Sequence, residues 1–337
     1  MLKKIIKMVL WTSAVPLTVV IVFLIYINWP VATSTAEYRP GVTFSIRYAQ
    51  DIGLNWREAY LAMLDELGVK KIRIPVYWDL VEGEEGTYNF SDIDWQIEEA
   101  AKRDAQVILV IGQKVPRWPE CFVPKWAEND ADKRKSHLLR MVANTVNRYK
   151  SNSAVQYWQI ENEPFLDFGI CPVLDVNLLD MEIAMARWSD PSRPILITDS
   201  GEISLWIKAA SRADVFGTTM YRDVVSRRFG AWKYPIGPRF FHFKRWLAHT
   251  FANQDRIIVI ELQGEPWLDG WTTGFPLADQ FGSMNAVKLE DNIQFARQAG
   301  FSDIYIWGVE WWYWLKVQNG HPELWETAQY IFQNKSE

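Results

Sequence analysis

Two glutamates stand where buried strands are predicted to end. Residues 155–164 read VQYWQIENEP, an apolar run rich in β-branched and aromatic residues that stops at Glu163 and its polar neighbours. The aliphatic run 257–260 leads directly into Glu261 in the same way. In parallel α/β folds the catalytic residues gather at the carboxyl ends of the strands. Two carboxyl groups that face each other at such an edge suit acid/base and nucleophilic catalysis on an acetal.

A third glutamate competes with Glu261 for the nucleophile role. Glu265 follows four residues later in the loop sequence QGEPW. We prefer Glu261 as the nucleophile, because a strand end holds a side chain more rigidly than a loop that contains glycine. Glu265 is then expected to contact the substrate. For Glu163, a simpler role as a turn cap before Pro164 stays open from the tripeptide alone.

Strand-like and helix-like segments alternate from Gly41 onward, which is typical of βαβ units and a parallel sheet. Eight strands that alternate with helices in a chain of 337 residues match a (β/α)8 TIM barrel of the α/β class better than an open doubly wound sheet. The predicted strands cover residues 42–46, 71–75, 106–111, the run in 155–164, 195–198, 215–218, 257–260 and 304–307. The predicted helices lie at 56–67, from 91, at 130–149, from 202, and near 240–251, 284–298 and 322–333.

The first 40 residues are expected to lie outside the barrel. Three lysines precede an apolar run without a charge at residues 8–28, which is long enough to cross a bilayer. Lysines on the N-terminal side of the apolar run are expected to place the N-terminus in the cytoplasm. We therefore predict a transmembrane signal anchor with a short stem, and an extracytoplasmic catalytic domain over residues 41–337. Cleavage near Ala36, which would release a secreted enzyme, is the alternative.

Composition and motifs argue against several other classes of protein. The net charge of -5 and the pI near 5.6 leave no basic stripe for nucleic acid. No glycine pattern that binds phosphates follows a strand, so we expect no nucleotide cofactor. The four histidines are not paired at metal-ligand spacing, so we expect no metal ion. The G-x-S-x-G motif of serine hydrolases is absent.

Polar and aromatic residues also follow the other predicted strands. Arg73 belongs to the second strand, Gln113 follows the third, Tyr221 follows the sixth, and Trp307 and Trp311 end or follow the eighth. Together with the glutamates they are expected to surround one pocket at the mouth of the barrel. The chain has 19 tryptophans, and the faces of sugar rings stack well on indole. An oligosaccharide, polysaccharide or glycoside is therefore the expected partner.

These residues resemble a known clan of enzymes. Asn162-Glu163-Pro164 at the fourth strand, Glu261 at the seventh and Arg73 at the second are similar to the (β/α)8 retaining glycoside hydrolases of the clan that contains families 5, 39 and 42. The resemblance runs from about residue 41 to the C-terminus. It implies that Glu163 is the acid/base and Glu261 the nucleophile.

The same resemblance implies roles for the residues around them. Asn162 would bond the sugar 2-hydroxyl, Tyr221 would orient the nucleophile, and Arg73 would support it from below. Trp307 or Trp311 would form the floor of the sugar subsite. The chain departs from the clan pattern by placing a Gln-Lys pair after the third strand and a second acid after the nucleophile. These departures leave the family and the sugar open.

The expected activity is hydrolysis of O-glycosidic bonds, of β configuration, by double displacement. Transglycosylation is an alternative, because a sugar hydroxyl can capture the covalent intermediate in place of water. A barrel that only binds carbohydrate is a second alternative. Such a protein would not need both glutamates, and this chain has both.

The only two cysteines, Cys121 and Cys171, fall in loops that follow the third and fourth strands. Both loops are expected on the same face of the barrel, so the cysteines can meet there. In an oxidising compartment outside the cytoplasm they would form a disulfide. Two buried free thiols are the alternative.

Overall fold

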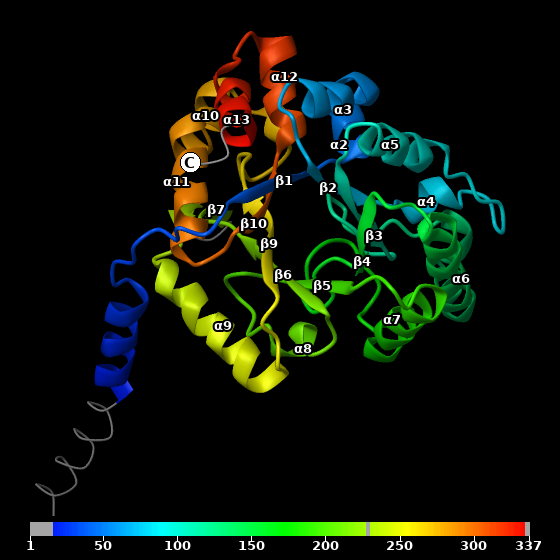
Figure 1. Cartoon of the computed structure of the whole chain (residues 1–337), viewed down its shortest axis with the longest axis horizontal. Coiled ribbons are helices and arrows are strands. Elements are labelled where there is room, and N and C mark those ends of the chain that lie inside the picture. The colour runs from blue at the N-terminus through cyan, green and yellow to red at the C-terminus, as the bar shows by residue number, and fades with distance from the viewer. Residues whose placement is uncertain (1–15, 227–229, 334–337) are drawn as a thin grey trace, which may run out of the picture.

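Eight parallel strands close into a barrel in the order β1-β10-β9-β6-β5-β4-β3-β2. The computed structural model describes residues 16–226 and 230–333. Figure 1 looks into the barrel and shows the helices arranged around it. The (β/α)8 barrel predicted from the sequence is confirmed. Its strands are β1 (Arg39–Thr43), β2 (Lys71–Pro75), β3 (Gln106–Ile111), β4 (Val155–Ile160), β5 (Ile195–Asp199), β6 (Val215–Met220), β9 (Ile257–Gln263) and β10 (Asp303–Trp307).

Polar caps begin several of the helices that surround the barrel. Side chains of Asn55, Asp130, Asp175 and Asn285 each accept a backbone N–H of the first helical turn. The helices are α2 (Ile46–Asp51), α3 (Trp56–Asp65), α4 (Trp78–Val81), α5 (Ser91–Ala101), α6 (Ala131–Tyr149), α7 (Val176–Ser189), α8 (Ile207–Ala210), α9 (Pro238–Ala252), α10 (Leu277–Ser283), α11 (Ala286–Gln298), α12 (Val309–Asn319) and α13 (Glu323–Gln333). Two short 3-10 turns lie at Lys125–Ala127 and Thr272–Gly274.

The first strand differs from its predicted range. It was expected at residues 42–46, but it runs from Arg39 to Thr43. The shift has a local cause, because the Ser45 side chain accepts the N–H of Tyr48 and starts helix α2 at Ile46. The helix expected from Glu202 also begins later, at Ile207. The residues between β5 and α8 are therefore a loop.

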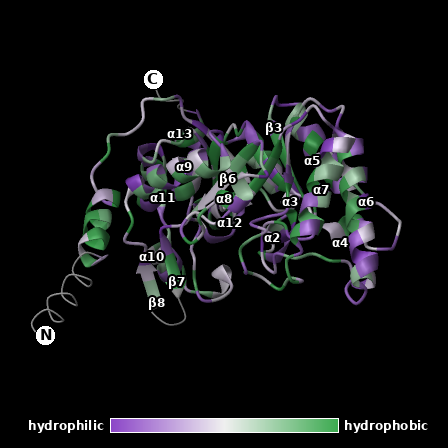
Figure 2. Ribbon diagram, turned by 90° about the horizontal axis from the view of Figure 1, so that it is seen from below, coloured by the Kyte–Doolittle hydropathy of each residue, from purple (hydrophilic) through white to green (hydrophobic). Residues whose placement is uncertain are grey.

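The interior of the barrel has an apolar part and a polar part. Arg73 is paired with Ile108 in the β2–β3 register, so both side chains point inward. Ile108 belongs to an apolar cluster of strand residues, whereas Arg73 and Gln159 are buried and polar. A larger apolar core fills the space between strands and helices, and Figure 2 shows apolar residues concentrated on the strands. The apolar cluster consists of Ile108, Leu196, Val215, Ile260 and Tyr305.

An antiparallel hairpin follows β6. Its strands are β7 (Asp223–Ser226) and β8 (Gly230–Lys233), with Asp223 opposite Lys233. The sequence analysis did not predict this hairpin. It interrupts the alternation of strands and helices just beyond the carboxyl end of β6, next to the site described below.

A helical segment at residues 16–27 precedes the barrel and extends away from it (Figure 1). Its Phe23 ring packs edge-on against Phe243 of α9 at 5.2 Å, and Asn28 Nδ2 donates to the carbonyl of Pro235 at 3.3 Å. Within residues 16–226 and 230–333, no helix is long and apolar enough to span a membrane. Part of the predicted anchor at residues 8–28 lies outside the described residues.

Candidate active site

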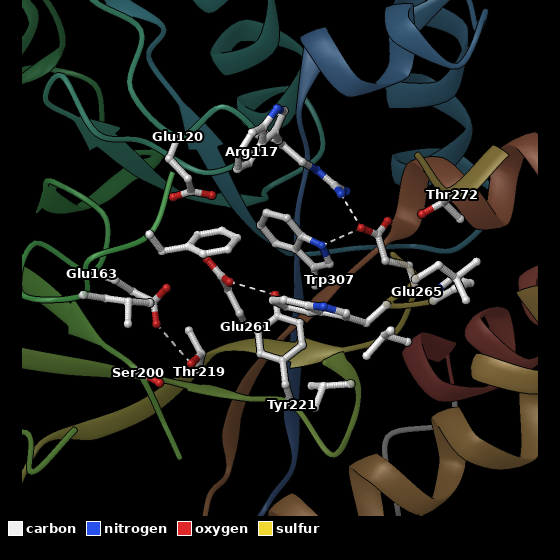
Figure 3. Close-up of a pocket in the computed structure, with 18 of the residues that line it drawn as sticks. Arg117, Glu120, Glu163, Ser200, Thr219, Tyr221, Glu261, Glu265, Thr272 and Trp307 are labelled. Atoms are coloured by element: carbon white, nitrogen blue, oxygen red, sulfur yellow. Dashed lines mark hydrogen bonds and ion pairs between the residues drawn. The ribbon is translucent and has the colours of Figure 1, made fainter. Parts of the chain in front are cut away.

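A cavity of about 620 Å³ opens at the carboxyl ends of the strands (Figure 3). It is within the usual size range of a ligand pocket. Glu163 and Glu261 line it, and the β7–β8 hairpin contributes Val225 and Trp232. The lining is strongly acidic, with seven acidic side chains and one arginine, Arg117. The acidic residues are Asp51, Glu120, Glu163, Asp167, Glu202, Glu261 and Glu265.

Glu163 lies in the turn that follows β4, where its φ is 42°. Its N–H donates to Thr198 Oγ1 at 2.8 Å, and its Oε1 accepts from Thr219 Oγ1 at 3.2 Å. Burial and the negative charges of Glu261 and Glu120 raise the pKa of Glu163 well above its usual range. A carboxyl group that keeps its proton near neutral pH can act as a general acid.

Glu261 is held from two sides. Arg73 Nη1 donates to Oε1 at 2.6 Å, and the Tyr221 hydroxyl donates to Oε2 at 2.9 Å (Figure 3). Arg73 has no exposed surface, so it reaches Glu261 from inside the barrel. Each carboxylate oxygen thus has its own donor, which fixes the orientation of the group and stabilises its ionised form. Arg73 and Tyr221 are therefore both direct contacts of Glu261.

Asn162 is fixed at both ends of its amide group. Its Oδ1 accepts from Arg73 Nη2 at 2.7 Å, and its Nδ2 donates to Glu120 Oε2 at 3.2 Å. A guanidinium only donates and a carboxylate accepts, so this pair of neighbours determines which end of the amide is nitrogen. Asn162 is 2% exposed and is not among the residues that line the cavity, although it was expected to bond the sugar.

Glu120 is a residue of the site that the sequence analysis missed. It lies in the loop after β3, is 7% exposed and has a φ of 74°. Burial and the charge of Glu261 raise the pKa of Glu120 to about 8. No strand pattern points to it, because the loop folds back on itself through a bridge between Lys114 and Cys121. The one feature of the sequence that could have pointed to Glu120 is its position directly before Cys121.

Glu265 lines the cavity but is already bound by protein groups. Arg117 Nη1 donates to its Oε1, and Trp307 Nε1 donates to the same oxygen at 2.7 Å (Figure 3). Arg117 Nη2 also donates to Glu310 Oε2 at 2.9 Å. These bonds hold Glu265 at the wall beside Trp307.

Gln113 is not where we predicted it. It was expected to contact the substrate, but it does not line the cavity. Gly112, with a φ of 154°, turns the chain so that the N–H groups of Gln113 and Lys114 donate to the Glu161 carboxylate at 2.9 and 2.6 Å. The backbone of Gln113 therefore supports the loop that carries Glu163.

Trp311 is a second correction. It was expected to share the floor of the sugar subsite with Trp307, but it is fully buried and does not line the cavity. Helix α12 begins at Val309, directly after β10, and turns Trp311 into the core, where its Nε1 donates to Gln280 Oε1 at 2.8 Å. Trp307 alone of the two lines the cavity.

The rim of the cavity is braced by a disulfide between Cys121 and Cys171, whose Cα atoms are 5.2 Å apart. It joins the loops that follow β3 and β4. Trp118 and Phe168, from the same two loops, line the cavity with ring centroids 6.0 Å apart. Trp118 is 56% exposed, so its ring is accessible to a sugar.

The family model described as Cellulase (glycosyl hydrolase family 5) matches residues 39–206. The match includes Arg73, Asn162 and Glu163 and ends before Glu261. No curated protein sequence matches the chain significantly.

Solved structures share the fold at low sequence identity. A cold-adapted β-galactosidase from Rahnella sp. R3 has a TM-score of 0.62 at 11% identity, over 91% of this chain and 57% of that chain. The GH5_18 structure from Bifidobacterium longum has a TM-score of 0.58 at 12% identity, over 81% of this chain and 70% of that one. A GH10 endoxylanase from a sugarcane soil metagenome has a TM-score of 0.54 at 13% identity, over 81% of this chain and 86% of that chain. The chain thus spans little more than half of the β-galactosidase. In its fold, in the carboxylate pair and in the match over residues 39–206, the chain is similar to the (β/α)8 glycoside hydrolases of the clan that contains families 5, 39 and 42.

Proposed function

We propose that this chain is a glycosidase that cleaves β-glycosidic bonds with retention of configuration, with Glu163 as acid/base and Glu261 as nucleophile. The observation that carries the proposal is the contrast between two carboxyl groups in one cavity. Glu261 is paired with the guanidinium of Arg73 and also accepts from Tyr221. Among the described residues, the hydrogen bond to the Glu163 carboxyl group comes from the neutral hydroxyl of Thr219, and the pKa of Glu163 is raised. One group is prepared to attack and the other to donate a proton.

The reaction has two steps. First, a Glu261 oxygen attacks the anomeric carbon while the bond to the leaving oxygen breaks, and Glu163 gives its proton to that oxygen. The sugar is then esterified to Glu261, and Glu163 is ionised. Second, Glu163 removes a proton from water, the water oxygen attacks the anomeric carbon, and the ester bond to Glu261 breaks. The enzyme returns to its starting protonation state.

The shape of the cavity supports an oligosaccharide substrate. Exposed rings of Trp118, Phe168 and Trp271 line it beyond the carboxylate pair, and they offer flat surfaces for further sugar rings. One similar structure, a GH5_18 variant, was solved in complex with Manβ1-4GlcNAc. The same subsites would serve an acceptor sugar, so transglycosylation shares this mechanism up to the second step.

The test uses the purified protein with a panel of aryl β-glycosides. Wild type should release the aglycone and give the β-anomer first, as followed by NMR. Glu261→Gln should lose turnover, because the attacking oxygen is gone. Glu163→Ala should keep activity only on glycosides with an activated leaving group, and azide should restore it as a β-glycosyl azide. An α-anomer as first product would refute retention, and full activity of Glu261→Gln would refute the nucleophile.

We also propose that residues 8–28 anchor the enzyme in a membrane, with the barrel outside the cytoplasm. The uncharged apolar run supports this, and so does the disulfide, which needs an oxidising compartment. In cells, the full chain should stay with membranes after carbonate extraction, and added protease should reach the barrel. Recovery of the chain in the soluble fraction with residues 1–36 removed would instead support a secreted form.

A further inference from the structure

Helix α7 buries a glutamate on its apolar side. Glu182 is 1% exposed and lies on the same side of the helix as buried leucine and isoleucine side chains. The helix packs against α6, β4 and β5 (Figure 1). Among the described residues, the titratable group that acts on Glu182 is Glu161, which follows β4 directly and is 4% exposed. Two carboxyl groups therefore meet in the core, behind the turn that carries Glu163.

The contacts of this pair indicate which of the two groups holds a proton. Both oxygens of Glu161 accept backbone N–H groups, Oε1 from Gln113 at 2.9 Å and Oε2 from Lys114 at 2.6 Å. Glu161 and Glu182 are also hydrogen-bonded to each other, and two carboxylates cannot bond without a proton, because both only accept. Oε2 of Glu182 has no partner in the described part of the chain, so a negative charge on Glu182 would be buried without a donor. Glu182 is thus the protonated partner and Glu161 the carboxylate.

Glu161 connects the loop that follows β3 with the turn that follows β4. Its carboxylate holds the backbone of the loop, and Lys114 of that loop holds the turn, with Nζ donating to the carbonyls of Glu163 and Leu166 at 3.1 and 2.7 Å. The N–H of Asn162 also donates to the carbonyl of Lys114 at 2.7 Å. The charge of Glu161 therefore supports the network of bonds that sets the position of Glu163.

We infer that Glu182 is a positioning residue for the acid/base, because its proton keeps Glu161 in the ionised form that holds the loop and the turn together. The link to the acid/base rests on the proposed function, whereas the shared proton does not. Glu182 does not line the cavity and acts only through Glu161. A buried carboxylate needs several donors, and the carboxyl group of Glu182 supplies one more without adding a charge.

The pair becomes unstable when Glu182 loses its proton, because two carboxylates then face each other in the core. Lys114 is a cation that acts on Glu161, but the charge that acts on Glu182 is that of Glu161. Burial and this charge raise the pKa of Glu182 well above its usual range. The stability that the bound proton contributes is complete below the pKa of the unfolded chain, about 4.3, and is lost as pH rises through the raised pKa of the folded state.

Two substitutions separate the hydrogen bond from simple packing. Glu182→Gln keeps a neutral donor to Glu161, whereas Glu182→Leu has an apolar side chain of similar size and no donor. On an aryl β-glycoside that the wild type cleaves, kcat/KM of Glu182→Gln should stay close to the wild-type value. That of Glu182→Leu should fall about 10- to 100-fold, as it does when a catalytic group is misplaced. Packing alone predicts the reverse order, and equal activity of the two variants would overturn the positioning role.

Urea unfolding at several pH values tests the proton itself. The ratio of the unfolding equilibrium constant of the wild type to that of Glu182→Gln should rise about tenfold for each pH unit between the unfolded and folded pKa values, because only the wild type loses this proton on unfolding. Titrating groups common to both proteins cancel from the ratio. The infrared difference spectrum at neutral pH should contain the C=O stretch of a protonated carboxyl group in the wild type only. A ratio that does not change with pH would overturn the inference.

Hydrogen exchange reads the position of the loop and the turn without any substrate. Peptides that cover residues 112–116 and 161–166 should exchange faster in Glu182→Leu than in Glu182→Gln. At alkaline pH they should also exchange faster in the wild type than in Glu182→Gln, which decides the matter if Glu182→Leu does not fold. Equal exchange would overturn the positioning role. Asp180→Asn is the matched control, since it removes an exposed acid of the same helix that is paired with Arg212, and it should leave kcat/KM unchanged.

These results are distinct from failure of the proposed function. A wild type that cleaves no aryl glycoside would count against the glycosidase, while exchange and urea unfolding would still decide whether Glu182 holds the proton and the turn. An active enzyme in which Glu182→Leu behaves like Glu182→Gln would count against the role of Glu182 alone.

Discussion

Removing one oxygen atom from Tyr221 tests how the nucleophile is held. The phenol donates to Glu261 Oε2 at 2.9 Å, while Arg73 holds the other oxygen at 2.6 Å. In Tyr221→Phe one of these two donors is lost and the rest of the ring is kept. A hydrogen bond to a charged group contributes about 1.5–3 kcal/mol, so kcat/KM should fall about 10- to 150-fold. Tyr221 is only half-buried at the cavity wall, so the melting temperature should change little.

The assay is steady-state hydrolysis of an aryl β-glycoside, with thermal unfolding measured on the same samples. Tyr149→Phe is a matched control, since Tyr149 donates to Asp94 Oδ1 at 2.8 Å between α6 and α5, far from the cavity. It should lower the melting temperature and leave kcat/KM unchanged. The opposite pattern in the two variants, or a rise in KM alone for Tyr221→Phe, would refute the assignment of Tyr221 to the nucleophile.

Three further predictions concern stability and pH. Arg73→Met leaves the Glu261 carboxylate buried without its cation and should lower the free energy of unfolding by about 3–5 kcal/mol in urea titrations; an unchanged midpoint would contradict the buried pair. Replacing Cys121 and Cys171 by alanine removes a bridge with a sequence separation of 50 and should lower the free energy of unfolding by about 2–4 kcal/mol. Addition of a reductant should destabilise the wild type and should not destabilise the variant. Because Glu163 must be protonated to act as an acid, kcat/KM should fall as pH rises through its raised pKa. In Glu261→Gln the loss of a nearby negative charge should lower that pKa, which NMR of labelled glutamate side chains measures; an unmoved titration would show that the two groups do not interact.

The barrel, and the position of Glu163 and Glu261 in one cavity, could be predicted from the sequence for one physical reason. A buried strand must be apolar along its length, so the point where polarity begins marks its carboxyl end. Glu163 and Glu261 stand at such points, and all eight barrel strands overlap their predicted ranges. Arg73 was predicted as a polar residue between the apolar residues Ile72 and Ile74 of the second strand.

The errors arose where the chain turns immediately after a strand. Gln113 and Trp311 both follow strand ends, but Gly112 redirects the first and the start of α12 redirects the second. Sequence distance from a strand end does not reveal which way a side chain faces after a turn. Glu120 was missed for the opposite reason. It lies far along a loop and returns to the site only because that loop folds back and is tied by the disulfide.

The close contact between Gly112 and Glu161 limits how this chain can vary. A Cβ atom at position 112 would lie 2.6–2.9 Å from the carboxyl atoms of Glu161, so any side chain there would force this carboxyl group to shift. A shorter residue at 161 would make room, but it would leave the N–H groups of Gln113 and Lys114 without their acceptor. Neither position can therefore change first without harming the turn that carries the acid/base. Among related sequences we expect the two positions to be exchanged as a pair or not at all.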